Sequence, residues 1–120
     1  MKILVLGGDG YLGWPTALHL SQAGHEVAVA DNFIRRHYDD ELGVESLVPI
    51  EPLRTRIAAW RELTGQQIGM YVGDLTDPIF TYHVIGAFAP AITVGGKKRP
   101  SRLPPQSSDA PPFAASSTQA

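Results

Sequence analysis

The sequence predicts an α/β fold: the N-terminal part of a doubly wound parallel sheet, followed by a disordered tail. Three observations predict it. Short apolar runs at residues 2–6, 27–30 and 68–72 are each followed by a glycine or an aspartate. Segments with helix-delimiting residues separate these runs, and strands that alternate with helices form parallel sheets with right-handed crossovers. After residue 94 the apolar pattern ends, so we expect the folded body to end there.

The first three elements follow from local patterns. Lys2 to Leu6 is predicted to be a strand, because a run that is apolar on both faces is typical of a buried parallel strand. A helix is expected from Tyr11 to Ala23, since Pro15 lies near its start and Gly24 just after its end. A second strand is predicted at Val27 to Ala30.

The remainder of the body continues the same alternation. A third strand is predicted at Ile68 to Val72, and Pro78 to Phe88 is predicted to be the start of another helix. Between the second and third strands lies a longer stretch, residues 33–67, in which one helix is expected from Leu53 to Leu63. Such an order is expected of the opening half of a doubly wound sheet.

Composition excludes several classes of function. A chain of 120 residues forms about one small domain. The net charge of −2 provides no general attraction to nucleic acid or anionic membrane, and no apolar run approaches the about 18 residues of a membrane span. With no cysteine and no signal-peptide pattern, the sequence predicts a soluble, cytoplasmic protein. No metal site is predicted, because the histidines lack ligand spacing: His19, His25, His37 and His83.

Charge and proline divide the chain into two parts. Residues 1–85 carry a net charge of −5, whereas residues 86–120 carry +3 and six of the ten prolines. We therefore predict a partial domain over residues 1–94 and a disordered tail rich in Pro, Ser and Ala over residues 95–120. A solvated tail is favoured over a basic or proline-rich binding segment. The abrupt change in composition leads to the hypothesis that a frameshift or truncation joined an N-terminus to unrelated sequence.

The turn after the first strand carries most of the predicted chemistry. Glycines at positions 7, 10 and 13 form a Gly-x-x-Gly-x-x-Gly pattern between a strand and a helix. In a Rossmann-type fold Gly7 permits the tight turn, Gly10 lets the backbone approach a pyrophosphate, and Gly13 allows close helix packing. The amides at the helix N-terminus then bind the phosphates. The context predicts dinucleotide binding rather than an ordinary glycine-rich turn.

Asp31, at the end of the second strand, is predicted to accept hydrogen bonds from the adenosine ribose and to repel a 2′-phosphate. The neighbouring Arg35 and Arg36 introduce an alternative, because guanidinium groups near this ribose would favour NADP. Asp31 is expected to dominate, so NAD is the predicted cofactor. For Asp74, after the third strand, two interpretations stay open: a contact to the adenine edge, or a turn and capping aspartate.

These motifs resemble a known family. Gly-Gly-Asp-Gly-Tyr-Leu-Gly-Trp at 7–14, Ala-Leu-His-Leu at 17–20 and Asp-Asn-Phe-Ile-Arg-Arg at 31–36 resemble the extended short-chain dehydrogenase/reductase group, the NAD-dependent epimerases and dehydratases of nucleotide sugars. Trp14, the double arginine and the segment at 43–50 narrow the resemblance to the family of UDP-sulfoquinovose synthases. The resemblance covers residues 1–85, about the N-terminal quarter of such an enzyme.

The resemblance implies a tightly bound NAD and, for the full-length family, conversion of UDP-glucose and sulfite to UDP-sulfoquinovose for sulfolipid biosynthesis, with a homodimer possible. It implies that the Tyr11-Leu12 backbone faces the pyrophosphate, that Asn32 and Arg35 flank the ribose beside Asp31, and that Asp74-Leu75 borders the adenine. Trp14, like Trp60, is instead expected to pack in the core.

The departures from the family concern catalysis. A Tyr-x-x-x-Lys pair, in which the ammonium lowers the tyrosine pKa, is absent from these 120 residues. The residues four positions after the tyrosines are Pro15, Leu42, Leu75 and Gly86. No catalytic residue is therefore predicted, and the chain is expected to be inactive alone. The alternatives are a non-catalytic dinucleotide-binding fragment or part of another NAD-dependent sugar-nucleotide epimerase or dehydratase.

Overall fold

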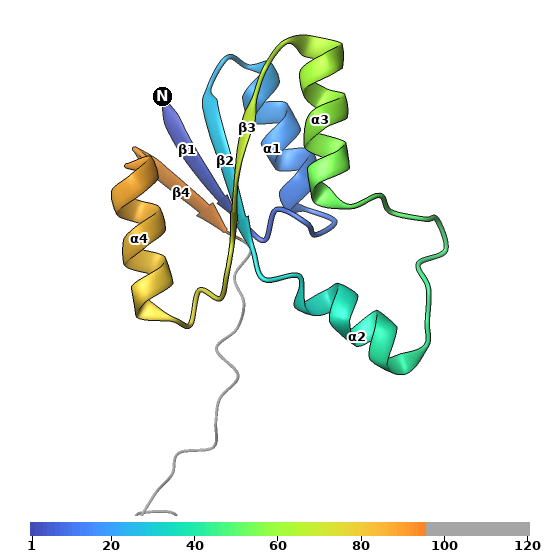
Figure 1. The fold of residues 1–120 in the computed structure, drawn as a ribbon. Helices are drawn as coiled ribbons and strands as arrows, with labels where there is room; N and C mark the ends of the chain where they lie inside the picture. Colours follow the sequence, from blue (N-terminus) through green and yellow to red (C-terminus); the bar gives the residue numbers. More distant parts are fainter. Residues whose placement is uncertain (96–120) are drawn as a thin grey trace, which may run out of the picture.

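The computed structural model describes residues 1–95, which form a sheet with helices on both faces (Figure 1). All strand pairs are parallel, and the strand order is β3-β2-β1-β4. The strands are β1 (Lys2–Leu6), β2 (Glu26–Asp31), β3 (Ile68–Val72) and β4 (Ile92–Gly95). The helices are α1 (Gly13–Gln22), α2 (Ile34–Leu42), α3 (Leu53–Thr64) and α4 (Pro78–Phe88). The predicted α/β fold with a Rossmann-like parallel sheet is confirmed.

The two central strands, β1 and β2, are covered on both faces. In β1 the side chains of Ile3, Leu4 and Val5 are at most 4% exposed, and in β2 residues 27–30 are at most 2% exposed. A strand that is buried on both sides can be apolar at every position, which explains why these runs show no alternation of apolar and polar residues.

Helices α1 and α3 cover one face of the sheet, and α4 covers the other (Figure 1). The first core cluster joins the sheet to α1 and α3 through Val5, Ala17, Val27, Val29, Leu53 and Ile68. The second joins it to α4 through Leu4, Ala28, Ala30, Val84 and Phe88. The chain therefore changes faces after β3 and returns beside β1. In open parallel sheets such a reversal of strand order marks the crevice where ligands bind.

The helix ends follow the residues that predicted them. Gly24, Gly43 and Gly65 follow α1, α2 and α3 with φ angles of +90°, +62° and +73°, which only glycine adopts readily. Before α4, Asp77 accepts a hydrogen bond from the Ile79 amide at 2.9 Å and so caps the helix. The helix predicted to start at Pro78 does so in the structure, and it ends at Phe88.

Both tryptophans pack partly buried against the cluster under α1 and α3, as predicted. The Trp60 indole donates a hydrogen bond to the Ser21 hydroxyl at 3.0 Å, and this hydroxyl donates to Gln66 Oε1 at 3.0 Å. Because Ser21 is only 2% exposed, these bonds supply the partners that a buried hydroxyl needs, and they link α1 to α3.

Two features differ from the sequence prediction. Residues 33–67 contain two helices, α2 and α3, where one was expected. Gly95, predicted to belong to the tail, is the last residue of β4, because its backbone lies in register with Leu6 of β1. The rest of the predicted tail, residues 96–120, lies outside the described residues. Within the part that is described, no helix is both long enough and apolar enough to cross a membrane.

Candidate functional site

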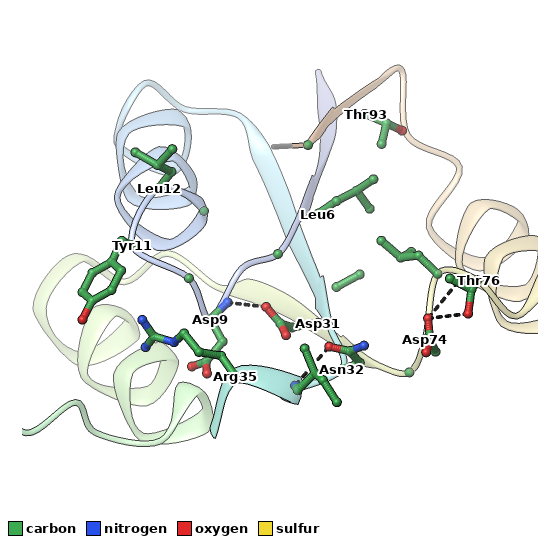
Figure 2. Close-up of a pocket in the computed structure, with 18 residues that line it drawn as sticks. Leu6, Asp9, Tyr11, Leu12, Asp31, Asn32, Arg35, Asp74, Thr76 and Thr93 are labelled. Carbon is green, nitrogen blue, oxygen red and sulfur yellow. Dashed lines mark hydrogen bonds between the residues drawn. The ribbon is translucent and has the colours of Figure 1, made fainter. Parts of the chain in front are cut away.

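An open pocket of about 790 Å³ lies at the carboxyl ends of the strands, where β1 and β4 meet. The structure brings all ten predicted cofactor-binding residues to this one pocket: Gly7, Gly10, Tyr11, Leu12, Gly13, Asp31, Asn32, Arg35, Asp74 and Leu75. They come from the glycine turn, the end of β2, the start of α2 and the segment after β3 (Figure 2). Their assignment to NAD stays a prediction.

The glycine turn is packed as tightly as its sequence implies. Gly7 has a φ angle of +78°, and its amide donates to the Ala30 carbonyl of β2 at 2.8 Å. A Cβ atom on Gly13 would lie 1.9 Å from the Gly7 carbonyl oxygen, and one on Gly10 would lie 3.2 Å from the same atom. The sequence predicts that Gly13 allows close packing of the helix. In the structure, the atoms nearest to a Cβ on Gly13 are backbone atoms of Gly7 and Gly8, so the close packing is between the start of α1 and the glycine turn.

Gly8 is a further required glycine, which was not among the predicted residues. A Cβ atom there would lie 2.3 Å from Cβ of Val29 in β2, so any side chain would force the turn off the sheet. The sequence indicates the need for Gly8 only through the Gly7-Gly8 doublet, because Gly8 lies outside the Gly-x-x-Gly-x-x-Gly spacing of positions 7, 10 and 13.

Helix α1 begins directly at the turn and has no side-chain cap at its N-terminus. Its first residue, Gly13, and the preceding Leu12 both line the pocket. A helix N-terminus concentrates amide donors and the positive end of the helix dipole, so this arrangement suits an anionic group such as a diphosphate.

The Asp31 carboxylate is held by two backbone amides. Oδ2 accepts a hydrogen bond from the Asp9 amide at 2.9 Å (Figure 2). Oδ1 accepts one from the Phe33 amide at 2.8 Å. Each carboxylate oxygen can accept more than one hydrogen bond, so both oxygens keep capacity for the hydroxyls of a ligand. Next to it, the Asn32 side chain accepts from the Ile34 amide at 3.1 Å, which fixes the start of α2.

The remaining predicted residues lie at the two flanks. At one flank, the Arg35 guanidinium lies over the Tyr11 ring, 4.4 Å from its centroid, a cation–π contact. At the other, Asp74 Oδ1 accepts from the Thr76 amide and from the Thr76 hydroxyl, each at 2.8 Å. These bonds agree with the interpretation of Asp74 as a turn aspartate. Asp74 also lines the pocket, as a contact to the adenine edge would require.

A charged cluster at the turn, formed by Asp9, Arg36 and Arg56, is not indicated by any pattern in the sequence. Asp9 is 4% exposed and forms ion pairs with Arg36 of α2 and Arg56 of α3. Hydrogen bonds to Asp9 raise the pKa of Arg36, whereas burial lowers the pKa of Arg56. Arginine stays protonated in proteins, so both carry their charge at neutral pH. The Arg56 guanidinium also lies 4.8 Å from the Trp14 ring centroid.

Comparison with protein-family models finds no match. Two curated proteins are similar over most of the chain. The chloroplastic UDP-sulfoquinovose synthase of Spinacia oleracea is 44% identical over 93 residues, which are 78% of this chain and 19% of that protein. The UDP-sulfoquinovose synthase of Sulfolobus acidocaldarius is 40% identical over 90 residues, 75% of this chain and 23% of that protein. The chain thus spans about a fifth of the length of these relatives.

Among solved structures, the UDP-glucose 4-epimerase of Bifidobacterium longum, in complex with NAD⁺ and UDP, matches with a TM-score of 0.57 at 21% identity. The match covers 79% of this chain and 24% of the epimerase, and at this identity it shows a shared fold. The identities to the two curated synthases make this chain UDP-sulfoquinovose synthase-like, of the NAD-dependent epimerase/dehydratase family, over about a fifth of the length of those proteins.

Proposed function

We propose that residues 1–95 form the NAD-binding part of a nucleotide-sugar enzyme similar to the UDP-sulfoquinovose synthases. The observation that carries the proposal is the pocket in which the glycine turn faces a carboxylate held at the end of β2. These are the two groups that the adenosine half of NAD requires, amides for its diphosphate and an acceptor for its ribose hydroxyls.

The remaining pocket residues are assigned by position. The Tyr11-Leu12 backbone faces the diphosphate, Asn32 and Arg35 flank the ribose held by Asp31, and Asp74-Leu75 borders the adenine. NAD held here by the glycine turn and Asp31 would supply a hydride acceptor for sugar chemistry. What this chain supplies is orientation of that cofactor, through the turn and the carboxylate.

For a full-length enzyme of this kind we propose UDP-glucose and sulfite as substrates, on the strength of the similarity to UDP-sulfoquinovose synthases. The chain of 120 residues contains no Tyr-x-x-x-Lys pair, so we expect it to bind NAD without turning over these substrates. A non-catalytic dinucleotide-binding fragment is the second candidate, and this same absence favours it. A cytoplasmic location, and a homodimer for a full-length enzyme, stay predictions.

The test is calorimetric titration of the full chain with NAD and NADP. We expect wild type to prefer NAD, and Asp31→Ala to lose about tenfold or more in NAD affinity, because a hydrogen bond to a charged group contributes about 1.5–3 kcal/mol. The preference for NAD over NADP should also narrow, since the charge that repels a 2′-phosphate is removed.

Asp40→Ala is the matched control, because Asp40 is exposed on α2 and does not line the pocket. Its affinities should equal those of wild type. No heat of binding with NAD, or equal NAD affinity before and after Asp31→Ala, would contradict the proposal. Turnover of UDP-glucose and sulfite by the chain alone would contradict its non-catalytic part.

A further inference from the structure

Asp9 is an unusual residue for its position in the glycine turn. Its side chain is 4% exposed, yet it carries a negative charge within a turn that we propose binds a diphosphate. An unpaired buried carboxylate is costly and would repel a phosphate group. The surrounding contacts must therefore compensate the charge, and they indicate what Asp9 does in the turn.

Two guanidinium groups compensate the charge. Arg36 makes a bidentate pair with Asp9, from Nε to Oδ2 at 2.6 Å and from Nη2 to Oδ1 at 2.9 Å. Arg56 Nη2 also donates to Oδ1. Two cations on one anion leave a net positive charge beside the turn, which favours an anionic ligand. Asp9 lines the pocket, whereas neither Arg36 nor Arg56 does.

The pairing occupies Arg36 almost completely. All three nitrogens of its guanidinium donate hydrogen bonds, because Nη1 reaches the Ile50 carbonyl at 3.1 Å and Nη2 also reaches the Glu51 carbonyl at 2.9 Å. Arg36 lies five residues after Asp31 in the sequence. In proteins that use NADP, an arginine close to this position binds the 2′-phosphate. Held by Asp9, this guanidinium is unavailable to such a phosphate.

Asp9 also acts on the group that excludes the 2′-phosphate. Its backbone amide donates to Asp31 Oδ2 at 2.9 Å, which holds the carboxylate at the end of β2 (Figure 2). One residue is thus bonded to both side chains that decide which cofactor fits, Asp31 through its amide and Arg36 through its carboxylate.

We infer that Asp9 is a positioning residue that sets the preference of this pocket for NAD over NADP, by keeping Arg36 out of the pocket while its amide orients Asp31. The inference rests on the proposed function. It assigns a specific use to a residue between the motif glycines, where the Gly-x-x-Gly-x-x-Gly pattern requires no particular side chain.

The experiment compares NAD and NADP affinities of the full chain, wild type and Asp9→Asn, by calorimetry. Asparagine keeps the shape and the backbone amide of Asp9 but removes the charge that retains Arg36. We expect the ratio of NADP affinity to NAD affinity to rise at least about tenfold, the scale of one charge-assisted hydrogen bond. Circular dichroism and thermal melting establish that each variant is folded. Asp9→Ser serves as a second variant with the same expectation.

Double variants separate positioning from general damage. In Asp9→Asn combined with Arg36→Gln the affinity ratio should return toward the wild-type value, because no released guanidinium remains. Asp9→Asn combined with Arg54→Gln, at an exposed arginine of α3 outside the pocket, should keep the raised ratio. If the Arg36 double variant keeps the raised ratio as well, the assignment to Arg36 is overturned.

The outcomes distinguish the two levels of the argument. If wild type does not bind NAD, the proposed function fails and the role of Asp9 fails with it. If wild type binds NAD and the folded Asp9 variants lose both cofactors equally, or keep the wild-type ratio, only the role of Asp9 is overturned, and Asp9 is a structural residue of the turn.

Discussion

At Gly13 the first helix begins against the backbone of the glycine turn, and the space is too small for a side chain. A Cβ atom would lie 1.9 Å from the Gly7 carbonyl oxygen, a backbone atom that cannot rotate away. We therefore expect Gly13→Ala to displace the turn from the start of α1. The expected results are a lower melting temperature and an NAD affinity reduced about tenfold or more, since amides that bind phosphate act only when correctly placed.

Gly86 provides the matched control for this substitution. It lies exposed in α4, and a Cβ atom there would have no neighbour within 4 Å. Gly86→Ala should stabilise the protein by up to about 1 kcal/mol through helix propensity, with NAD affinity unchanged. Both variants are measured by urea denaturation and calorimetry. A Gly13→Ala protein as stable as wild type would show that the turn adapts to a methyl group.

At the same scale, the pocket residues divide by the range of their interactions. Gly7, Asp31 and Asp74 could be identified from the sequence, because each lies at or just after the end of an apolar strand and the chemistry of that position is local. Asp9 could not be identified in this way, because its partners Arg36 and Arg56 are 27 and 47 residues away in the sequence. No pattern near Asp9 indicates which cations will contact it.

Among the elements, α4 depends on a single capping side chain. Asp77 Oδ1 accepts from the Ile79 amide at 2.9 Å, and Pro78 occupies the first turn. We expect Asp77→Ala to lower the free energy of unfolding by about 1 kcal/mol, the usual contribution of an N-cap. Asp77→Asn, which keeps an acceptor oxygen, should lower it by only a few tenths. Urea denaturation measures both, and equal losses for the two variants would argue against capping.

Helix α2 shows why one element escaped prediction. None of its residues is buried, and its N-cap residue, Phe33, has a φ angle of 55° and forms no side-chain cap. The Ile34 amide bonds instead to Asn32, one residue before the N-cap position. An apolar stripe and a capping residue directly before the helix are the signals from which helices are predicted. The contacts of α2 with the glycine turn, among them the pairing of Arg36 with Asp9, depend on the completed fold. The other three helices bury apolar residues and were predicted.

For the whole molecule, the two core clusters found among residues 1–95 lie well before the end of β4. Both core clusters draw only on residues between Leu4 and Phe88. We expect a chain that ends at Gly95 to melt within a few degrees of the full chain and to bind NAD with the same affinity. Differential scanning calorimetry and titration with NAD provide the measurements. A large fall in melting temperature would mean that residues 96–120 contribute to the fold.

The position of β1 in the centre of the sheet has a consequence for the order of assembly. β1 is made first, yet one of its two neighbours is β4, with Ile3 in register with Ile92. Closing so long a loop has a high entropic cost, and contacts of large sequence separation form slowly. During synthesis β1 can pair with β2 early, but its other edge must wait for nearly the whole described chain to emerge. Thr93 and Gly95 of β4 line the pocket, so the pocket described here can form only after β4 has been synthesised.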